Sequence, residues 1–287
     1  MSIEVKYPEE HNVYAMKRIW KICFGDTDEY INFFFEKVYK KENALVAFYD
    51  LKPVGMLFML PCKLKINDRE YKGNYLYAVC TKPDYRNKGI MRQLELGAQF
   101  VAKALKLDFL CLVPATPSLF KMYEKLDYKS TFYLGHKKAM VFPSSHVEGI
   151  EISNCSKDEF ISIRNTFLNQ KACYLDFNES LIDFRYENFI HLEWQLLHIK
   201  ANGNSHYIAG YLQDDTFIIH ETTLDTDLLN LALPLVAERF DTTFIKARGL
   251  KGKIDSIEPF GMFKWTNSEM NSSNIKSLNP YMNLMLD

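Results

Sequence analysis

Hydrophobic and polar residues follow two different spacings along the first half of the chain, and each spacing predicts one kind of element. Short apolar runs predict strands at residues 3–6, 44–49, 54–66, 75–81 and 109–113, and two further strands within residues 128–141. Apolar positions three or four residues apart predict helices at about 12–24, 28–40, 90–105 and 116–125. The resulting order, β-α-α-β-β-β-α-β-α-β-β, predicts an α/β (α+β) fold with a mixed sheet.

A proline- and serine-containing stretch at residues 142–146 predicts a linker, so we expect two domains, at residues 1–142 and 147–287. Beyond the linker, strands are predicted at 148–153, 207–212, 217–222 and 243–247, and helices at 157–170, 179–193 and 227–240. The strand–turn–strand–helix–strand order in this half is similar to that of the first half and suggests an internal repeat. The last residues, 281–287, predict a final strand.

One strand–loop–helix junction carries the clearest chemical signal in the sequence. The strand ending at Thr81 leads through a short loop to Arg86-Asn87-Lys88-Gly89-Ile90-Met91, where a helix begins. Backbone N–H groups at a helix start are unpaired and carry the positive end of the helix dipole. Gly89 lets a ligand approach these groups, and Arg86 and Lys88 add two positive charges. The junction therefore predicts a pyrophosphate site.

This junction resembles the signature of the GNAT superfamily of acyl-CoA-dependent N-acyltransferases, Arg/Gln-x-x-Gly-x-Gly/Ala after a strand. The last position here is Met91, whose side chain must point away from the cofactor. The resemblance implies a GNAT fold over residues 1–142, with acetyl-CoA as co-substrate. It also implies that the backbone of Val79, Cys80 and Thr81 pairs with the pantetheine arm. The pyrophosphate would be held by Arg86, Asn87, Lys88, Gly89, Ile90 and Met91.

By the same resemblance, Tyr123 is expected to be the catalytic acid. The family's Asn-x-x-Ala-x-x-x-Tyr-x-x-x-Gly-Phe pattern corresponds to residues 116–128, with Thr116 for asparagine and Asp127-Tyr128 for Gly-Phe. A phenol there can protonate the departing thiolate, although Tyr123 could instead be a core residue with a wet hydroxyl. No general base is evident, because residues 74–81 contain no acid. Tyr75 and Tyr77 could line the acceptor pocket, and Glu29, Glu36 or a water chain could take the proton.

The second half lacks an equivalent phosphate turn. Its counterpart, residues 222–227, has no glycine and carries Asp225 and Asp227. Acids at a helix start occupy the anion site themselves and would repel a pyrophosphate. We therefore expect residues 147–287 to form a degenerate GNAT-like domain without a CoA site, as in tandem GNAT chains with one active and one inactive copy.

Composition narrows the class of protein. The net charge is -1, but residues 1–145 have 23 Lys+Arg against 16 Asp+Glu, and residues 146–287 have 12 against 20. A basic half suits a cofactor with several phosphates, and the overall balance predicts no nucleic-acid partner. The six cysteines have no CxxC spacing and the seven histidines no HxxxH, so we expect reduced thiols, a cytoplasmic location and no metal. No apolar stretch is long enough for a signal peptide or a membrane span, which predicts no membrane association.

The combined hypothesis is an N-acetyltransferase that transfers acetyl from acetyl-CoA to a primary amine by direct attack in a ternary complex. The acceptor would be a small molecule or a peptide. Two alternatives stay open. A non-catalytic CoA-binding regulatory or scaffold module would explain the missing strand acid. An aminoacyl-tRNA-dependent transferase can also have a tandem GNAT fold, but such enzymes lack a turn like that at residues 86–91.

Overall fold

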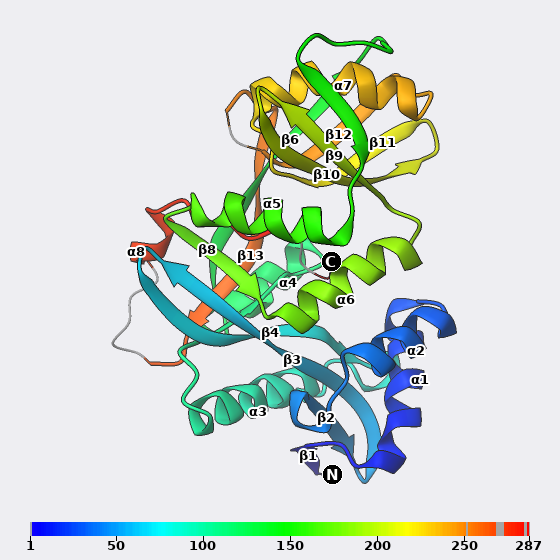
Figure 1. The fold of residues 1–287 in the computed structure, drawn as a ribbon. Coiled ribbons are helices and arrows are strands. Elements are labelled where there is room, and N and C mark those ends of the chain that lie inside the picture. The colour runs from blue at the N-terminus through cyan, green and yellow to red at the C-terminus, as the bar shows by residue number, and fades with distance from the viewer. Residues whose placement is uncertain (1, 251, 268–272, 284–285, 287) are drawn as a thin grey trace. The chain divides into compact units, whose positions relative to one another are not determined.

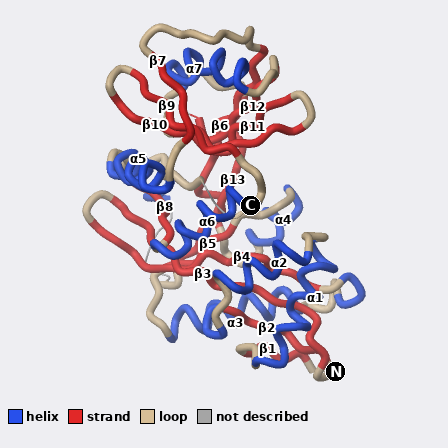
Figure 2. Tube along the Cα trace, turned by 45° about the vertical axis from the view of Figure 1, so that its right-hand side comes forward, coloured by secondary structure: helices blue, strands red, loops and turns tan. Residues whose placement is uncertain are grey.

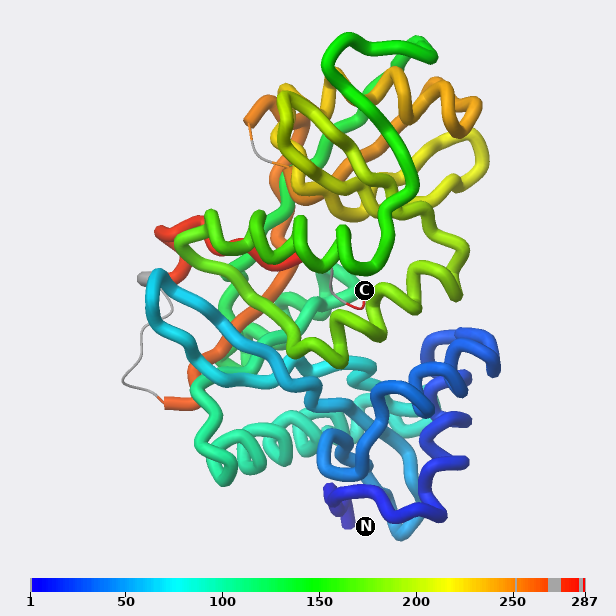
Figure 3. The backbone as a smooth tube through the Cα atoms, viewed as in Figure 1, coloured from blue at the N-terminus to red at the C-terminus, as the bar shows by residue number. Residues whose placement is uncertain are grey.

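The computed structural model describes residues 2–250, 252–267, 273–283 and 286, and the chain divides into two compact units. The first unit comprises Met1–Lys129, Leu175–Phe184 and Met262–Ile275. The second comprises Ser130–Tyr174, Arg185–Gly261 and Lys276–Asp287. The chain therefore enters each unit three times, and its path can be followed by colour in Figure 3.

The first unit is built on a mixed sheet with the strand order β1-β2-β3-β4-β5-β13. Strands β1 to β4 are labelled in Figure 1. Its strands are β1 (Ile3–Lys6), β2 (Ala44–Tyr49), β3 (Lys52–Ile66), β4 (Arg69–Thr81), β5 (Phe109–Leu112) and the end of β13 (Ser256–Trp265). Only β4 and β5 are parallel; the other neighbours are antiparallel. The short strand β8 (Cys173–Phe177) pairs with β3.

Alternate residues of β3 bury their side chains on opposite faces of this sheet, as the period of a strand requires. Leu57 and Met59 share a core with α3 (Ile90–Ala104), to which α4 (Pro117–Glu124) also contributes. Phe58 packs on the other face, where its ring centroid is 5.6 Å from that of Trp20 in α1 (Val13–Phe24) and 4.9 Å from that of Phe34 in α2 (Asp28–Lys37). The first unit thus has helices on both faces of its sheet.

In the second unit, the start of β13 is followed in the strand order by β6-β12-β11-β10-β9-β7, of which β11 and β12 are parallel. These are β6 (Lys129–Met140), β12 (Phe244–Leu250), β11 (Thr216–Thr222), β10 (Asn204–Gln213), β9 (Gln195–Ala201) and β7 (Ile150–Asn154). Helix α7 (Thr226–Arg239) packs on the face that carries Ile208, and α5 (Lys157–Asn169) packs through Phe160 on the face that carries Tyr207. Figure 2 colours the helices and strands separately. Two further helices, α6 (Glu179–His191) and α8 (Ser273–Lys276), cross the unit boundaries along the chain.

The predicted α/β fold with a mixed sheet is confirmed, but three strands, β8, β9 and β13, lie where none was predicted. Strand β13 contains Pro259 and Gly261, which favour edges and bends in a sequence pattern. The predicted final strand at residues 281–287 is reduced to one bridge between Tyr281 and Tyr174 within the described residues; residues 284, 285 and 287 lie outside them. None of the described helices is long and apolar enough to cross a membrane.

The unit boundaries differ from the predicted division at residues 142–147. Strand β6 was expected in the first domain, yet it pairs with β12 from Gly135 to Met140 and so belongs to the second unit. Conversely, Met262–Trp265 at the end of β13 pairs with β5 in the first unit. A linker signal in the sequence cannot reveal such returns, because strand pairing joins segments that lie far apart along the chain.

Candidate functional site

Strand β4 loses one neighbour partway along, which leaves an open edge. It pairs with β5 only over Gly73–Tyr75, whereas its pairing with β3 continues to Thr81. Ala78 has a positive φ of 49°, and the register with β3 shifts beside it, as in a β-bulge. Val79, Cys80 and Thr81 follow the bulge and lie beyond Tyr75, the last residue that pairs with β5. Among the described residues, the buried Thr81 Oγ1 has no hydrogen-bond partner.

The turn after β4 forms as the sequence predicts. Asn87 (φ 62°) and Gly89 (φ 80°) are both left-handed, a conformation that glycine and asparagine tolerate best. Gly89 is the N-cap of α3, and a Cβ built on it would meet nothing within 4 Å. The N–H groups of Tyr85 and Arg86 are used within the turn, where they donate to the carbonyls of Lys82 and Pro83. The N–H groups at the start of α3 have no acceptor one turn earlier in their own helix.

Both predicted cations are held beside this turn. Arg86 Nε donates to the Thr81 carbonyl over 3.2 Å, which links the turn to the end of β4. Lys88 Nζ lies 4.9 Å from the ring centroid of Tyr85 and 5.2 Å from that of Tyr49, so cation–π contacts restrict its position. Positive side chains, free helix-start amides and open space at Gly89 together suit an anionic ligand.

The two residues after Gly89 serve packing as well. Ile90 is 1% exposed and belongs to the core shared with α3, and Met91 packs against that same core. The Met91 side chain therefore has a place away from the turn, which accounts for a bulky residue at this position. Gly55 of β3 keeps the neighbouring backbones close, because a Cβ there would lie 2.8 Å from the Cys80 carbonyl oxygen and 3.1 Å from Ile90.

Tyr123 lies in α4 and is buried, with its ring centroid 5.6 Å from that of Tyr128 in a T-shaped contact. Burial raises the pKa of the Tyr123 phenol well above its usual value, and the Glu95 carboxylate and the Cys80 thiol raise it further. The phenol therefore keeps its proton at neutral pH, the form that a proton donor needs. The core that contains Tyr123 also contains Ile90, and Val79 of β4 packs against it. Tyr123 is a core residue by packing, and its role as the acid stays a prediction.

One further residue joins this site without having been predicted. Cys23, near the end of α1, is hydrogen-bonded to Cys80 and to Arg86. The hydrogen bond from Cys80, together with the positive charge of Arg86, outweighs burial and lowers the pKa of the Cys23 thiol to about 7. No pattern in the sequence could pair Cys23 with Cys80, because the helix and the strand that carry them meet only in the tertiary structure.

The residues considered as bases, and Tyr77, considered as part of an acceptor pocket, lie in different surroundings. Glu29 and Glu36 are exposed on α2. Tyr77, beside the bulge, has its hydroxyl 3.3 Å from that of Tyr30, and burial raises the pKa of Tyr77 well above its usual value. Asp26 accepts a hydrogen bond of 2.6 Å from Trp20 Nε1. Within the described residues, no group of three or more His, Cys, Asp or Glu side chains could hold a metal ion.

The counterpart turn in the second unit has a different chemistry. Asp225 caps α7, and its carboxylate accepts the Leu228 N–H over 2.8 Å. Asp227 follows in the first helical turn. A carboxylate already occupies the position that a phosphate would take, as the sequence indicated.

Comparisons with known proteins agree with the geometry of the first unit. Residues 4–131 match the acetyltransferase (GNAT) domain family. Three similar solved structures are a probable N-acyltransferase from Enterococcus faecalis (TM-score 0.72, 15% identity), a GCN5-related N-acetyltransferase from Anabaena variabilis (0.72, 15%) and Eis1 from Mycobacterium abscessus (0.66, 8%). Each similarity covers 93% of this chain. It covers 73% of the Enterococcus and Anabaena chains and 74% of the Mycobacterium chain. No curated protein matches the sequence. At these identities the solved structures establish a shared fold and no more.

Proposed function

This chain belongs to the GNAT superfamily through its residues 4–131, and from that premise we propose that it transfers an acetyl group from acetyl-CoA to a primary amine. The acceptor would be a small molecule or a peptide, attacked directly in a ternary complex. One observation carries the proposal. The end of β4 is no longer paired with β5, and it is followed by a turn in which Gly89, at the start of α3, has a left-handed conformation. A cytoplasmic location fits the six free cysteines.

The residues at the open edge and the turn suit the two parts of the cofactor. The backbone of Val79, Cys80 and Thr81 would pair with the amide-containing pantetheine arm, and the unpartnered Thr81 Oγ1 offers a further polar contact. The helix-start amides from Gly89 onward, with Arg86 and Lys88, would hold the pyrophosphate. Ala78 lies at the bulge, where the acyl end of the arm would meet the acceptor.

Acetyl transfer requires that the departing thiolate be protonated and that the attacking amine lose a proton. The amine nitrogen forms a bond to the thioester carbonyl carbon, the carbon–sulfur bond breaks, and the CoA thiolate leaves. Tyr123 would donate a proton, or at least a hydrogen bond, to that thiolate. The amine would lose its own proton to water, because residues 74–81 at the end of β4 have no carboxylate and the acids of α2 are exposed. An amide and free CoA are the products.

The experiment is a calorimetric titration of the full chain with acetyl-CoA, followed by an amine panel with release of the CoA thiol as the readout. Gly89→Glu should abolish binding, because it adds a negative charge and a bulky side chain where the pyrophosphate would lie. Gly203→Glu is the matched control, since Gly203 also has a positive φ (76°) and open space around its Cβ position. Unchanged binding in Gly89→Glu would contradict the proposed site. Binding without thiol release for any amine would favour a non-catalytic CoA-binding module.

A further inference from the structure

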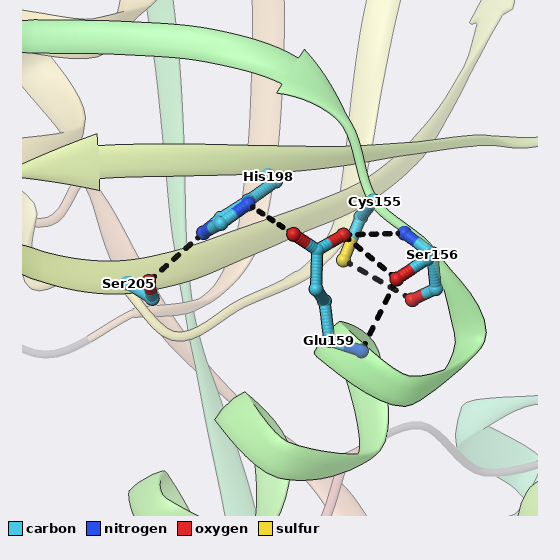
Figure 4. Close-up of polar contacts among 5 residues, drawn as sticks. All are labelled: Cys155, Ser156, Glu159, His198 and Ser205. Carbon is cyan, nitrogen blue, oxygen red and sulfur yellow. Dashed lines mark hydrogen bonds and ion pairs between the residues drawn. The ribbon is translucent and has the colours of Figure 1, made fainter.

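The second unit carries a line of three hydrogen-bonded side chains that acetyl transfer does not use. Ser205 Oγ lies 2.9 Å from His198 Nε2, and His198 Nδ1 lies 3.0 Å from Glu159 Oε1. Figure 4 shows the serine and the carboxylate on opposite edges of the imidazole ring. A hydroxyl, an imidazole and a carboxylate in this order are the parts of a serine nucleophile with its base and orienting acid.

The local fold explains why these residues meet. Asn202 and Gly203 both have positive φ, at 51° and 76°, and connect β9 to β10 as a two-residue hairpin turn. The register sets His198 opposite Tyr207 and Ser205 opposite Lys200, so His198 and Ser205 project from the same face. Helix α5 packs on that face with the Phe160 ring centroid 5.1 Å from that of Tyr207.

Glu159 is fixed by the start of its own helix. It is the third residue of α5, and its Oε2 accepts 2.8 Å hydrogen bonds from both the N–H and the hydroxyl of Ser156 in a capping box. These two bonds, helped by His198, lower the pKa of the Glu159 carboxyl below its usual value. The side chain is thus a charged acceptor with one oxygen engaged by the helix cap and the other by His198.

The carboxylate in turn decides which nitrogen of His198 carries hydrogen. Because Glu159 only accepts, a neutral His198 places its hydrogen on Nδ1 and leaves Nε2 as the acceptor for the Ser205 hydroxyl. The His198 side chain is 6% exposed, whereas Ser205 is exposed. The base is therefore held in packed surroundings, and the nucleophile faces the solvent from which a substrate would come.

We propose that Ser205, His198 and Glu159 form a second active site, which hydrolyses carboxylic esters with short acyl groups. Ser205 Oγ bonds to the ester carbonyl carbon as its proton passes to His198 Nε2. The ester carbon–oxygen bond then breaks, and the alcohol leaves with that proton. Water, deprotonated by His198, attacks the acyl-serine, which releases the carboxylic acid and restores Ser205. Glu159 is a positioning residue that keeps the imidazole in the required tautomer.

The backbone supplies a donor for the developing oxyanion. Tyr207 donates its N–H to Thr223 Oγ1 over 3.0 Å, so this N–H points away from β9. Ser205 lies two residues earlier in the same strand, and its N–H therefore points to the same side. Strand β11 has ended there, since its pairing with β10 begins at Ile208. In serine proteases, too, the backbone N–H of the nucleophilic serine donates a hydrogen bond to the oxyanion. We therefore assign the Ser205 N–H this role.

The test uses the full chain with a fluorophosphonate probe, which forms a stable adduct with activated serines, and p-nitrophenyl acetate as the ester. One adduct is expected, located at Ser205 by peptide mass spectrometry, and Ser205→Ala should remove both the adduct and the hydrolysis. His198→Gln should slow labelling by about 10²-fold. Glu159→Gln should slow it by at least about tenfold, although glutamine preserves the capping box and hence the melting temperature.

Asn204→Ala, in the same hairpin, is the matched control and should label like the parent chain. Acetylation of amines by Ser205→Ala should be unchanged, which separates this site from the proposed acetyltransferase function. No adduct after prolonged exposure would overturn the proposal. So would an adduct at another serine, or equal labelling rates in the parent chain and in His198→Gln, because these results would show that the three side chains only stabilise the hairpin and α5.

Discussion

At the scale of single residues, Tyr123 shows how burial selects the state of a side chain. Its surroundings raise the pKa of the phenol, so the group stays protonated through neutral pH and can donate but not abstract a proton. Cys23 shows the opposite, because a hydrogen bond from Cys80 and the charge of Arg86 lower its pKa to about 7. Two ordinary residues thus acquire different proton affinities near one strand end.

Replacing Tyr123 by phenylalanine tests its proposed role as the proton donor. If the phenol assists the departing thiolate, Tyr123→Phe should lower kcat by roughly 10²-fold and leave the affinity for acetyl-CoA nearly unchanged. Tyr128→Phe is the control, because Tyr128 is buried in the same core (0% exposed) and its ring contacts that of Tyr123. Turnover rates, calorimetry and melting temperatures of both variants distinguish the roles. A stable Tyr123→Phe variant with parental turnover would remove Tyr123 from the mechanism.

At the scale of elements, Gly55 lets β3 lie close to both β4 and the start of α3. The carbonyl oxygen of Cys80 and the side chain of Ile90 lie where a Cβ of residue 55 would sit. Since Cys80 belongs to the open edge and Ile90 to the first turn of α3, the same approach sets the distance between the two parts of the candidate cofactor site.

Gly55→Ala should therefore weaken both folding and acetyl-CoA binding. Inserting a methyl group into a filled space typically costs about 1–3 kcal/mol, and relief of the clash would displace β4 or α3. Urea unfolding measures the first effect and calorimetry the second. Gly25→Asn is a suitable control, because Gly25 has open space and a left-handed φ of 80° that asparagine tolerates. An alanine variant as stable as the parent would show that the elements can move apart without cost.

At the scale of the whole molecule, the first unit depends on segments that come late in the chain. Phe263 stacks on Phe109 with ring centroids 4.9 Å apart, and Phe177 lies 5.8 Å from Tyr75. Met262 is also fully buried and belongs to the α3-side core. The first 145 residues contain the candidate cofactor site, but they lack Phe177, Met262 and Phe263.

A fragment of residues 1–145 should consequently fail to fold cooperatively. Each lost apolar side chain removes about 1.5–3 kcal/mol of burial, so the three together approach the 5–15 kcal/mol that stabilises an ordinary domain. Thermal unfolding followed by circular dichroism, with the full chain as reference, measures this. A sharp transition near that of the full chain, with acetyl-CoA still bound, would show that the linker at residues 142–146 does end an independent domain.

The sequence by itself determined the features that depend on neighbours along the chain. The turn from Arg86 to Met91, the amphipathic α3 and the acid-capped start of α7 all follow from local rules for glycine, helix starts and hydrophobic spacing. These rules located the residues of the candidate cofactor site, although the roles of those residues stay predictions.

Only the tertiary structure decided which distant segments meet. It ended the pairing of β4 with β5 at Tyr75, brought Cys23 to Cys80, and aligned Ser205 and His198 with Glu159. It also returned residues 175–184 and 262–275 to the first unit, against the division expected at residue 142. Hydrophobic spacing states that a face is buried but not which partner covers it, because many partners of similar shape would satisfy the same pattern.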